Sequence, residues 1–157
     1  MSKTLNFITV QYEQQLYNFN MECQKQSMYL VDVKQDSKVI RVKESLLILE
    51  ELKSAIEKFE KAKKENHFST LVDNYQATVK FLNLQQQKYS IRYQSLFRYQ
   101  TEDKLQDIEK SFDMIEQYNL VNIIGRLIEL FIEENGGIMN EWDFKFNWFR
   151  IGDIKSW

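Results

Sequence analysis

Residues that commonly carry out catalysis or bind metals are few in this chain and stand apart from one another. His67 is the only histidine, and no cysteine or second histidine lies near it. A metal site or a Ser/His/Asp arrangement needs partner residues that this stretch does not supply. The acidic pair at 133–134, with Asp143 and Asp153, comes nearest to a carboxylate pair, but acids near helix ends are mostly solvated. We therefore expect no catalytic residue and no metal site.

The motifs that hold cofactors or nucleophiles are missing as well. The chain has no Gly-rich phosphate loop, GxSxG, HExxH, CxxC or EF-hand loop. Cys23, the only cysteine, cannot form an internal disulfide, which favours a reducing compartment, and the helical pattern around it predicts a small core side chain. We expect a protein that is not an enzyme and that binds no cofactor.

Composition and charge narrow the class of protein. With 157 residues, 43% hydrophobic and 28% charged, the chain has the composition of one folded domain. Its formal net charge of −2 gives no electrostatic footprint for nucleic acid, so the Tyr-rich run 88–100 is expected to pack between helices. No window of 18 uncharged apolar residues predicts a membrane span, and the first 15 residues do not resemble an export or transit signal.

Helical periodicity dominates the chain, which has no proline and carries its four glycines in the last third. Apolar residues recur three and four apart over 4–29, over 43–64 with a seam at Leu46, Leu49, Leu52, Ile56 and Phe59, and over about 70–96. A fourth helix is predicted to open at Thr101, with Leu105, Ile108, Phe112 and Ile115 as its seam. Asn119 either breaks it or lets it continue into the next segment.

Two segments are less regular. In residues 29–42, Val31 and Val33 alternate with Asp32, and β-branched residues follow KQDSK at 39–42, which fits a short hairpin or a loop between two helices. The most apolar helical run, 120–142, has a stripe at Leu120, Ile123, Ile124, Leu127, Leu130 and Phe131. Asn135-Gly136-Gly137 then predicts a helix end built from left-handed residues.

An aromatic tail follows. Alternation of aromatic and polar residues in 142–148 gives one face of an extended segment four rings. A small bundle cannot easily bury all of these, so we expect the tail to dock either on its own bundle or on a partner. The residues predicted to form the partner interface are Trp142, Phe144, Phe146, Trp148, Phe149 and Trp157.

The sequence thus predicts an all-α protein, a small bundle of four to five helices with an extended aromatic C-terminal tail. Its organisation as one domain is an N-terminal helix with a possible hairpin in 1–42, a bundle core in 43–137 and a docking tail in 138–157.

Residues 126–148, RLIELFIEENGGIMNEWDFKFNW, resemble the C-terminal part of the alpha subcomplex subunit 5 family, a small accessory subunit of mitochondrial respiratory complex I. That family has a Leu-x-Glu core, then Met-x-Glu-Trp and a second tryptophan. Here Leu127, Glu129 and Ile132, then Met139, Glu141, Trp142 and Trp148, occupy similar places. With the leucine-rich helix and the turn upstream, the resemblance covers about residues 46–148.

The chain departs from that family in lacking its prolines and in having only Gly125 before the last helix; the N-terminal 40 residues and much of 83–100 are additions. The resemblance implies a helical bundle without cofactor on the matrix arm of complex I, peripheral to the membrane and bound to other subunits. The expected location is then mitochondrial, or cytoplasmic if the resemblance does not hold.

Two other functions stay open. Long seams suit a coiled-coil-like subunit of a cytoskeletal or axonemal assembly, although broken heptads oppose a long rod. A small helical enzyme or a ligand carrier with a pocket between its helices is the alternative from a different class. We expect a structural subunit bound to other proteins, with no nucleic acid and no small-molecule substrate.

Overall fold

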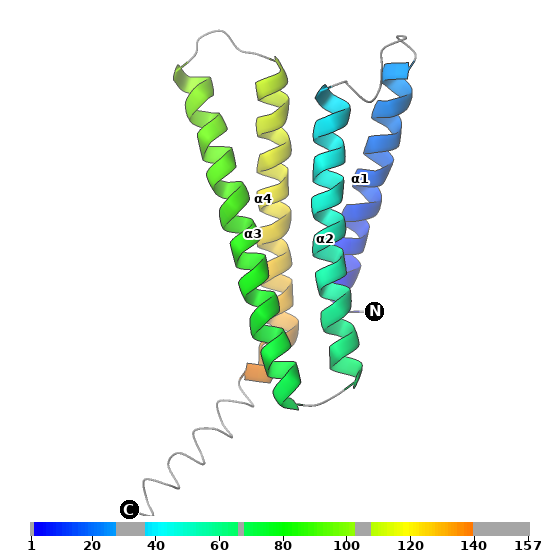
Figure 1. The fold of residues 1–157 in the computed structure, drawn as a ribbon, viewed down its shortest axis with the longest axis vertical. Coiled ribbons are helices and arrows are strands. Elements are labelled where there is room, and N and C mark those ends of the chain that lie inside the picture. The colour runs from blue at the N-terminus through cyan, green and yellow to red at the C-terminus, as the bar shows by residue number, and fades with distance from the viewer. Residues whose placement is uncertain (1, 28–36, 66–67, 103–107, 140–157) are drawn as a thin grey trace, which may run out of the picture.

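The part of the chain that the structure describes folds into four long helices that pack side by side (Figure 1). The computed structural model describes residues 2–27, 37–65, 68–102 and 108–139. The helices are α1 (Lys3–Ser27), α2 (Ser37–Glu65), α3 (Phe68–Glu102) and α4 (Ile108–Asn135). A short helical turn over 137–139 follows α4, and the described ranges contain no strand. The predicted all-α bundle is confirmed.

The helices form two antiparallel hairpins, α1 with α2 and α3 with α4 (Figure 1). The hairpins meet where α2 contacts α3 and where α1 and α2 contact α4, whereas α1 and α3 do not touch. Because the helices alternate in direction, α1 and α3 begin at one end of the bundle and α2 and α4 begin at the other. We call the end where α1 and α3 begin the aromatic end, and the end where α2 and α4 begin the charged end.

The aromatic end is built around three rings from three helices. Phe59 of α2 lies edge-on to Phe131 of α4, with ring centroids 4.8 Å apart, and Tyr75 of α3 stacks on Phe131 at 5.4 Å. Phe59 and Phe131 are at most 2% exposed, and Tyr75 is buried with them. Aromatic rings of this size each bury about 150–250 Å², and such pairs add about 0.5–1.5 kcal/mol beyond that burial. This cluster is the aromatic part of the apolar core.

The predicted seams of the middle and last helices are the core. On α2 the predicted seam is buried along its whole length, and on α4 the inner stripe is Leu120, Ile124, Leu127 and Phe131, while Ile123 and Leu130 are half-buried. A helix places residues three and four apart on one face, which is why these side chains meet. On α3 the buried hydrophobic residues are Leu71, Val72, Tyr75, Leu82 and Tyr89.

Several expectations about element boundaries are wrong. Val39 and Val42, expected in a strand or a loop, are buried residues of α2, because β-branched side chains on a core-facing stripe lose little in a helix that tertiary packing stabilises. Thr101, expected to open a helix, lies inside α3. Residues 29–36 lie outside the described residues, and α4 runs through Asn119 without a break.

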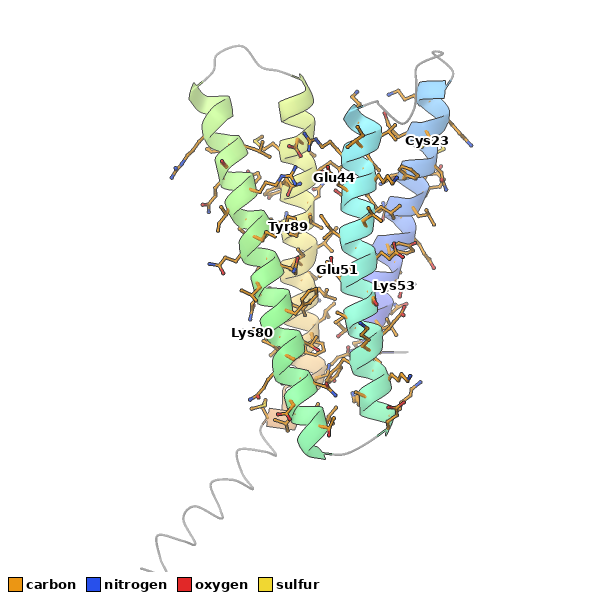
Figure 2. The ribbon with its side chains drawn as sticks, in the orientation of Figure 1. Cys23, Glu44, Glu51, Lys53, Lys80 and Tyr89 are labelled. Carbon is orange, nitrogen blue, oxygen red and sulfur yellow. The ribbon has the colours of Figure 1, made fainter. Side chains whose placement is uncertain are left out.

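Two predicted side-chain positions also need correction. Ile115, expected on a buried seam, is 54% exposed, because the inner stripe of α4 passes instead through the polar residues Asp113 and Gln117. Cys23, expected in the core, is half-buried in the C-terminal half of α1. Its place near the far end of α1 is visible in Figure 2.

The end of α4 at Asn135 matches the prediction, but its cause differs. None of the three described glycines has a left-handed backbone. Gly136 instead approaches the preceding turn so closely that a Cβ there would lie 2.6 Å from the Ile132 carbonyl oxygen. The Gly136 amide donates to that same oxygen at 2.7 Å. Glycine is needed here because only a residue without a side chain fits.

The beginning of α1 is held by the end of α4. The Glu134 carboxylate accepts hydrogen bonds from the backbone amides of Lys3 at 2.9 Å and Thr4 at 2.6 Å, and from the Thr4 hydroxyl. Amides in the first turn of a helix have no partner within the helix, so Glu134 acts as a cap supplied by another helix. This contact joins the first helix to the last.

No helix within the described ranges is long and apolar enough to cross a membrane.

Candidate interaction groove and charged ring

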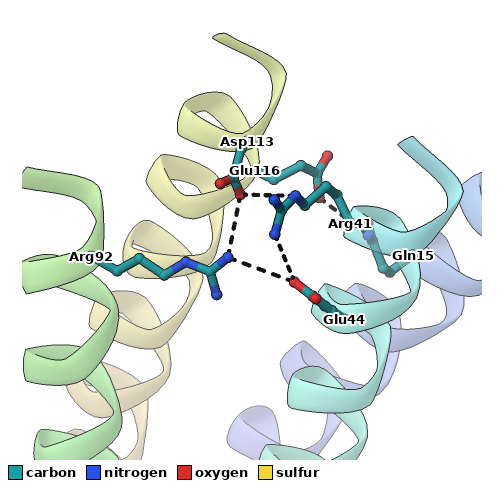
Figure 3. Close-up of polar contacts among 6 residues, drawn as sticks. All are labelled: Gln15, Arg41, Glu44, Arg92, Asp113 and Glu116. Atoms are coloured by element: carbon teal, nitrogen blue, oxygen red, sulfur yellow. Dashed lines mark hydrogen bonds and ion pairs between the residues drawn. The ribbon is translucent and has the colours of Figure 1, made fainter. Parts of the chain in front are cut away.

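Four charged side chains form a closed ring at the charged end of the bundle (Figure 3). Arg41 pairs with Glu44 at 3.4 Å, Glu44 with Arg92 at 3.7 Å, Arg92 with Asp113 at 3.7 Å, and Asp113 with Arg41 at 3.8 Å. Positive and negative groups alternate around the ring, which is therefore neutral as a whole. Because Arg41 and Glu44 belong to α2 and the other two to α3 and α4, the ring joins the two hairpins.

The members of the ring differ in burial. The Asp113 side chain is only 7% exposed, whereas those of Arg41, Arg92 and Glu44 are 36 to 42% exposed. The distances from Asp113 to both guanidinium groups exceed hydrogen-bond length, so the attraction is mainly Coulombic. Two cations balance the one buried carboxylate, and they keep contact with water through their exposed sides.

Next to the ring, Glu116 is held in a second polar contact that reaches α1. Its carboxylate accepts a hydrogen bond from Gln15 Nε2 at 3.4 Å, and Gln15 also donates to the Val42 carbonyl oxygen at 3.2 Å. Burial raises the pKa of Glu116, the neighbouring Asp113 raises it further, and hydrogen bonds from Ser45 and Gln15 oppose that rise. The net direction is upward, so the fold favours the protonated form of this carboxyl group.

Local sequence explains why polar groups meet at this end. The core-facing stripe of α4 runs through Phe131, Leu127, Ile124 and Leu120 and then continues, at the same spacing, through Gln117 and Asp113. Gln117 is 3% exposed, and its side-chain oxygen accepts no hydrogen bond from the described residues. Buried polar groups without partners cost free energy, so the burial of Gln117 opposes the stability of this end of the core.

An apolar groove runs between α2 and α3, along the line where the two hairpins meet. We call it the α2–α3 groove. It consists of three adjoining hollows of about 510, 490 and 210 Å³, which share lining residues. Its lining includes Leu47, Ile48 and Ala55 from α2 and Ala77, Phe81, Tyr89 and Ile91 from α3.

Side chains of both charge signs line the walls of the α2–α3 groove. Glu44 and Arg92 of the ring stand at one end, and Glu51 lies further along α2; Glu44 and Glu51 lie along the space between the hairpins, as Tyr89 does (Figure 2). Burial raises the pKa of the Tyr89 hydroxyl, and the nearby Glu51 raises it further. The Lys88 ammonium lies 5.4 Å from the centre of the Tyr89 ring. The groove thus has an apolar floor between rims of mixed charge.

A separate groove lies on the other side of α3, beside the end of α4. We call it the α3 outer groove. It measures about 470 Å³ and is lined by Tyr75, Gln76, Val79, Lys80, Asn83, Leu84, Gln87 and Met139. Met139 is the last described residue of the chain.

The predicted interface residues Trp142, Phe144, Phe146, Trp148, Phe149 and Trp157 lie outside the described residues. So do His67, Asp143 and Asp153. Among the described residues, no group of three or more His, Cys, Asp or Glu side chains is placed to hold a metal ion. The two acids at 133–134 do not act together as a carboxylate pair. Glu134 caps α1, whereas Glu133 is exposed.

Sequence reasoning missed both the ring and the α2–α3 groove. The ring had one readable signal, the continuation of the α4 stripe through Gln117 and Asp113, since a buried aspartate predicts a cationic partner. The groove had none, because it depends on how far apart two helices from different hairpins stand.

Comparison of the chain with protein-family models, with curated proteins and with solved structures gives no match.

Proposed function

We propose that this protein is a non-catalytic accessory subunit of a larger protein assembly, and that its α2–α3 groove receives a helix of a neighbouring subunit. The observation that carries the proposal is the exposure of large aliphatic side chains inside a concave surface. Leu47 is 53% and Ile91 is 60% exposed, on opposite walls of the groove. Covering such side chains is worth about 25 cal/mol per Å² of apolar area removed from water.

The shape and charge of the groove favour a helix as the occupant. The lining on α2 extends from Glu44 to Lys58, a rise of about 21 Å at about 1.5 Å per residue. A helix of about four turns spans that length, and apolar helix faces commonly lie in grooves of this kind. The rims hold Glu50 and Glu51 as well as Lys58 and Lys88, so the matching helix has an apolar stripe flanked by both signs of charge.

The aromatic tail provides a second contact in this proposal. Trp142, Phe144, Phe146, Trp148, Phe149 and Trp157 are concentrated in 16 of the 157 residues of the chain. Tryptophan and phenylalanine are enriched where subunits bind one another. We assign this tail to the contact with neighbouring subunits together with the groove.

The specific assembly that we propose is the matrix arm of mitochondrial respiratory complex I, which places the protein in mitochondria. Its support is the sequence resemblance of residues 46–148. The arrangement of the described helices as two packed hairpins favours a subunit of this kind over a rod-like cytoskeletal component (Figure 1).

The test is native capture of the tagged full chain from the cells that produce it, with the bound proteins quantified by mass spectrometry. The wild-type chain should bring down a constant set of partner subunits. The double variant Leu47→Glu, Ile91→Glu should lose the partner that occupies the groove, since two carboxylates cannot be buried there without large cost. Val10→Glu on α1, where valine is 48% exposed, is the matched control and should retain the whole set.

The outcomes separate the parts of the proposal. Equal capture by the double variant and the control would show that the groove does not bind a partner. Capture of an assembly other than complex I would overturn the location and leave the subunit function standing. A wild-type chain that stays monomeric and acts on a small molecule would overturn the proposal as a whole.

A further inference from the structure

The α3 outer groove has the lining of a binding site, and it lies where the described chain ends. Its apolar lining residues are Tyr75, Val79, Leu84 and Met139, and its polar lining includes the amides of Gln76, Asn83 and Gln87. Tyr75 is fixed from behind by its stacking on Phe131. The volume of about 470 Å³ falls within the range of about 300–1,000 Å³ typical of small ligand sites.

The chain leaves the bundle from within this groove. Ile138 and Met139 pack against the core, and the Met139 amide donates to the Gly136 carbonyl oxygen at 3.1 Å. Met139 itself lines the groove. The starting point of the segment that follows is thereby fixed beside Tyr75 and Val79.

We propose that residues 140–146 of the same chain lie in the α3 outer groove, with Trp142 as the side chain that fills it. Trp142 is three residues beyond Met139, so an extended chain places it within about 10 Å of the groove's edge. The lining from Tyr75 to Gln87 extends over about 18 Å of helix, and seven extended residues cover about 23 Å. The segment is therefore long enough to follow the whole groove.

Charge and alternation agree with this occupant. The segment reads Asn-Glu-Trp-Asp-Phe-Lys-Phe, with both acids at its start. Lys80, the cation of the groove, points outward from the same part of α3 (Figure 2). In an extended segment Trp142 and Phe144 share one face while Glu141 and Asp143 share the other, so the rings reach the floor and the acids stay near the rim with Lys80.

Attachment to the bundle favours this intramolecular contact over capture of a separate chain. A short tether gives an effective concentration in the millimolar range. This placement narrows the partner contact proposed above: Trp142, Phe144 and Phe146 lie on their own bundle, and Trp148, Phe149 and Trp157 are left for partner subunits. It concerns the isolated chain and does not depend on which assembly the protein joins.

Tryptophan fluorescence tests the proposal directly, because all three tryptophans of the chain are in the tail. In the full chain carrying Trp148→Phe and Trp157→Phe, Trp142 is the only indole. We expect blue-shifted emission and several-fold weaker acrylamide quenching than for a peptide of residues 140–157 with the same two substitutions. Adding Leu84→Glu should return both values to those of the peptide.

Leu47→Glu is the matched control, since Leu47 is 53% and Leu84 is 52% exposed and each lies on one groove only. It should leave Trp142 emission unchanged, and the far-UV circular dichroism of both variants should equal that of the parent. As a second measurement, Lys80→Glu should increase quenching, and Glu141→Lys with Asp143→Lys in that background should reverse the increase.

Three results would overturn the proposal. Peptide-like emission in the parent would mean that Trp142 is in water. A blue shift that disappears on dilution would mean that the tail binds a second copy. A shift caused by Leu47→Glu and not by Leu84→Glu would place the tail in the α2–α3 groove instead.

Discussion

The helices are held together by different kinds of interaction at the two ends of the bundle. At the aromatic end, Phe59, Tyr75 and Phe131 bring three helices together through contacts between their rings. At the charged end, the same three helices meet through the ring of Arg41, Glu44, Arg92 and Asp113. Apolar burial contributes net stability, whereas a buried ion pair recovers little more than the free energy lost on leaving water. The aromatic end should therefore supply most of the stability of the fold.

The ring contributes alignment rather than stability: it fixes how the two hairpins stand relative to each other. Apolar side chains pack in many orientations, but alternating charges fit only when α2, α3 and α4 stand at one height relative to each other. Polar groups inside helical assemblies are best known for fixing register in this way. The comparison suggests that one end holds the hairpins together and the other end aligns them.

The largest effect is expected at the aromatic end. Phe131→Ala should lower the free energy of unfolding by about 3–5 kcal/mol, because Phe131 is 0% exposed and its removal leaves a cavity beside two other rings. Chemical denaturation monitored by circular dichroism measures the change. Ile132→Ala, at a neighbouring residue that is 43% exposed, is the control and should change stability far less. A loss below 1 kcal/mol for Phe131→Ala would contradict the comparison.

A smaller loss is expected at the charged end. Asp113→Ala leaves Arg41 and Arg92 without their shared carboxylate, but both guanidinium groups are over a third exposed, and water relieves part of the cost. We expect a loss of about 1–3 kcal/mol. Glu129→Ala, which breaks the exposed pair with Arg126, should cost at most about 1 kcal/mol. If Asp113→Ala destabilises as much as Phe131→Ala, the two ends do not differ as proposed.

The cap on α1 should make a pH-dependent contribution at the aromatic end. Burial alone would raise the pKa of Glu134, but hydrogen bonds from Thr4 and Lys3 and the charge of Lys63 lower it below 4.5. A lowered pKa in the folded state stabilises the fold above the unfolded value and loses that effect as pH falls through the folded value. Glu134→Gln should cost about 0.5–2 kcal/mol at pH 7, as loss of a helix cap does, and less in acid. The exposed Glu133→Gln is the control.

Glu116 should behave in the opposite way, with the smallest effect. Its raised pKa means that the folded state prefers the protonated form, so stability is fully present below the unfolded value near 4.5 and is lost as pH rises through the folded value. Glutamine resembles the protonated form. Glu116→Gln should therefore be at least as stable as wild type at pH 7, and the difference should shrink in acid. A variant less stable than wild type at pH 7 would contradict this sign.

Sequence periodicity predicted the parts of the fold that apolar residues determine. The seam of α2 and the stripe from Leu120 to Phe131 were read correctly, because a core-facing helix needs apolar residues three and four apart. The same reliance on apolar residues led to a wrong prediction of the buried face in the first half of α4. Its apolar residue Ile115 suggested one face, while the buried face carries Asp113 and Gln117, whose burial depends on cations from other helices.

The candidate site was less predictable than the fold. The ring combines residues from α2, α3 and α4, and the α2–α3 groove is a property of two helices from separate hairpins. Neither can be derived from spacing along one helix. At 39–42 the local pattern fitted a hairpin strand or a loop between helices, and tertiary packing decided for a helix. The docking role of the tail stays a prediction, made from its aromatic content alone.

The cap that Glu134 places on α1 implies an order in which the molecule opens. The fully buried side chains of α1 within the described residues are Thr4 and Ile8, both close to that cap, whereas Phe19 and Cys23 near the other end are only half-buried. Local opening begins where few apolar contacts hold a helix. Backbone amides of α1 beyond Gln15 should exchange with deuterium first, and the Cys23 thiol should become reactive in that same motion while the amides beside Phe131 remain protected.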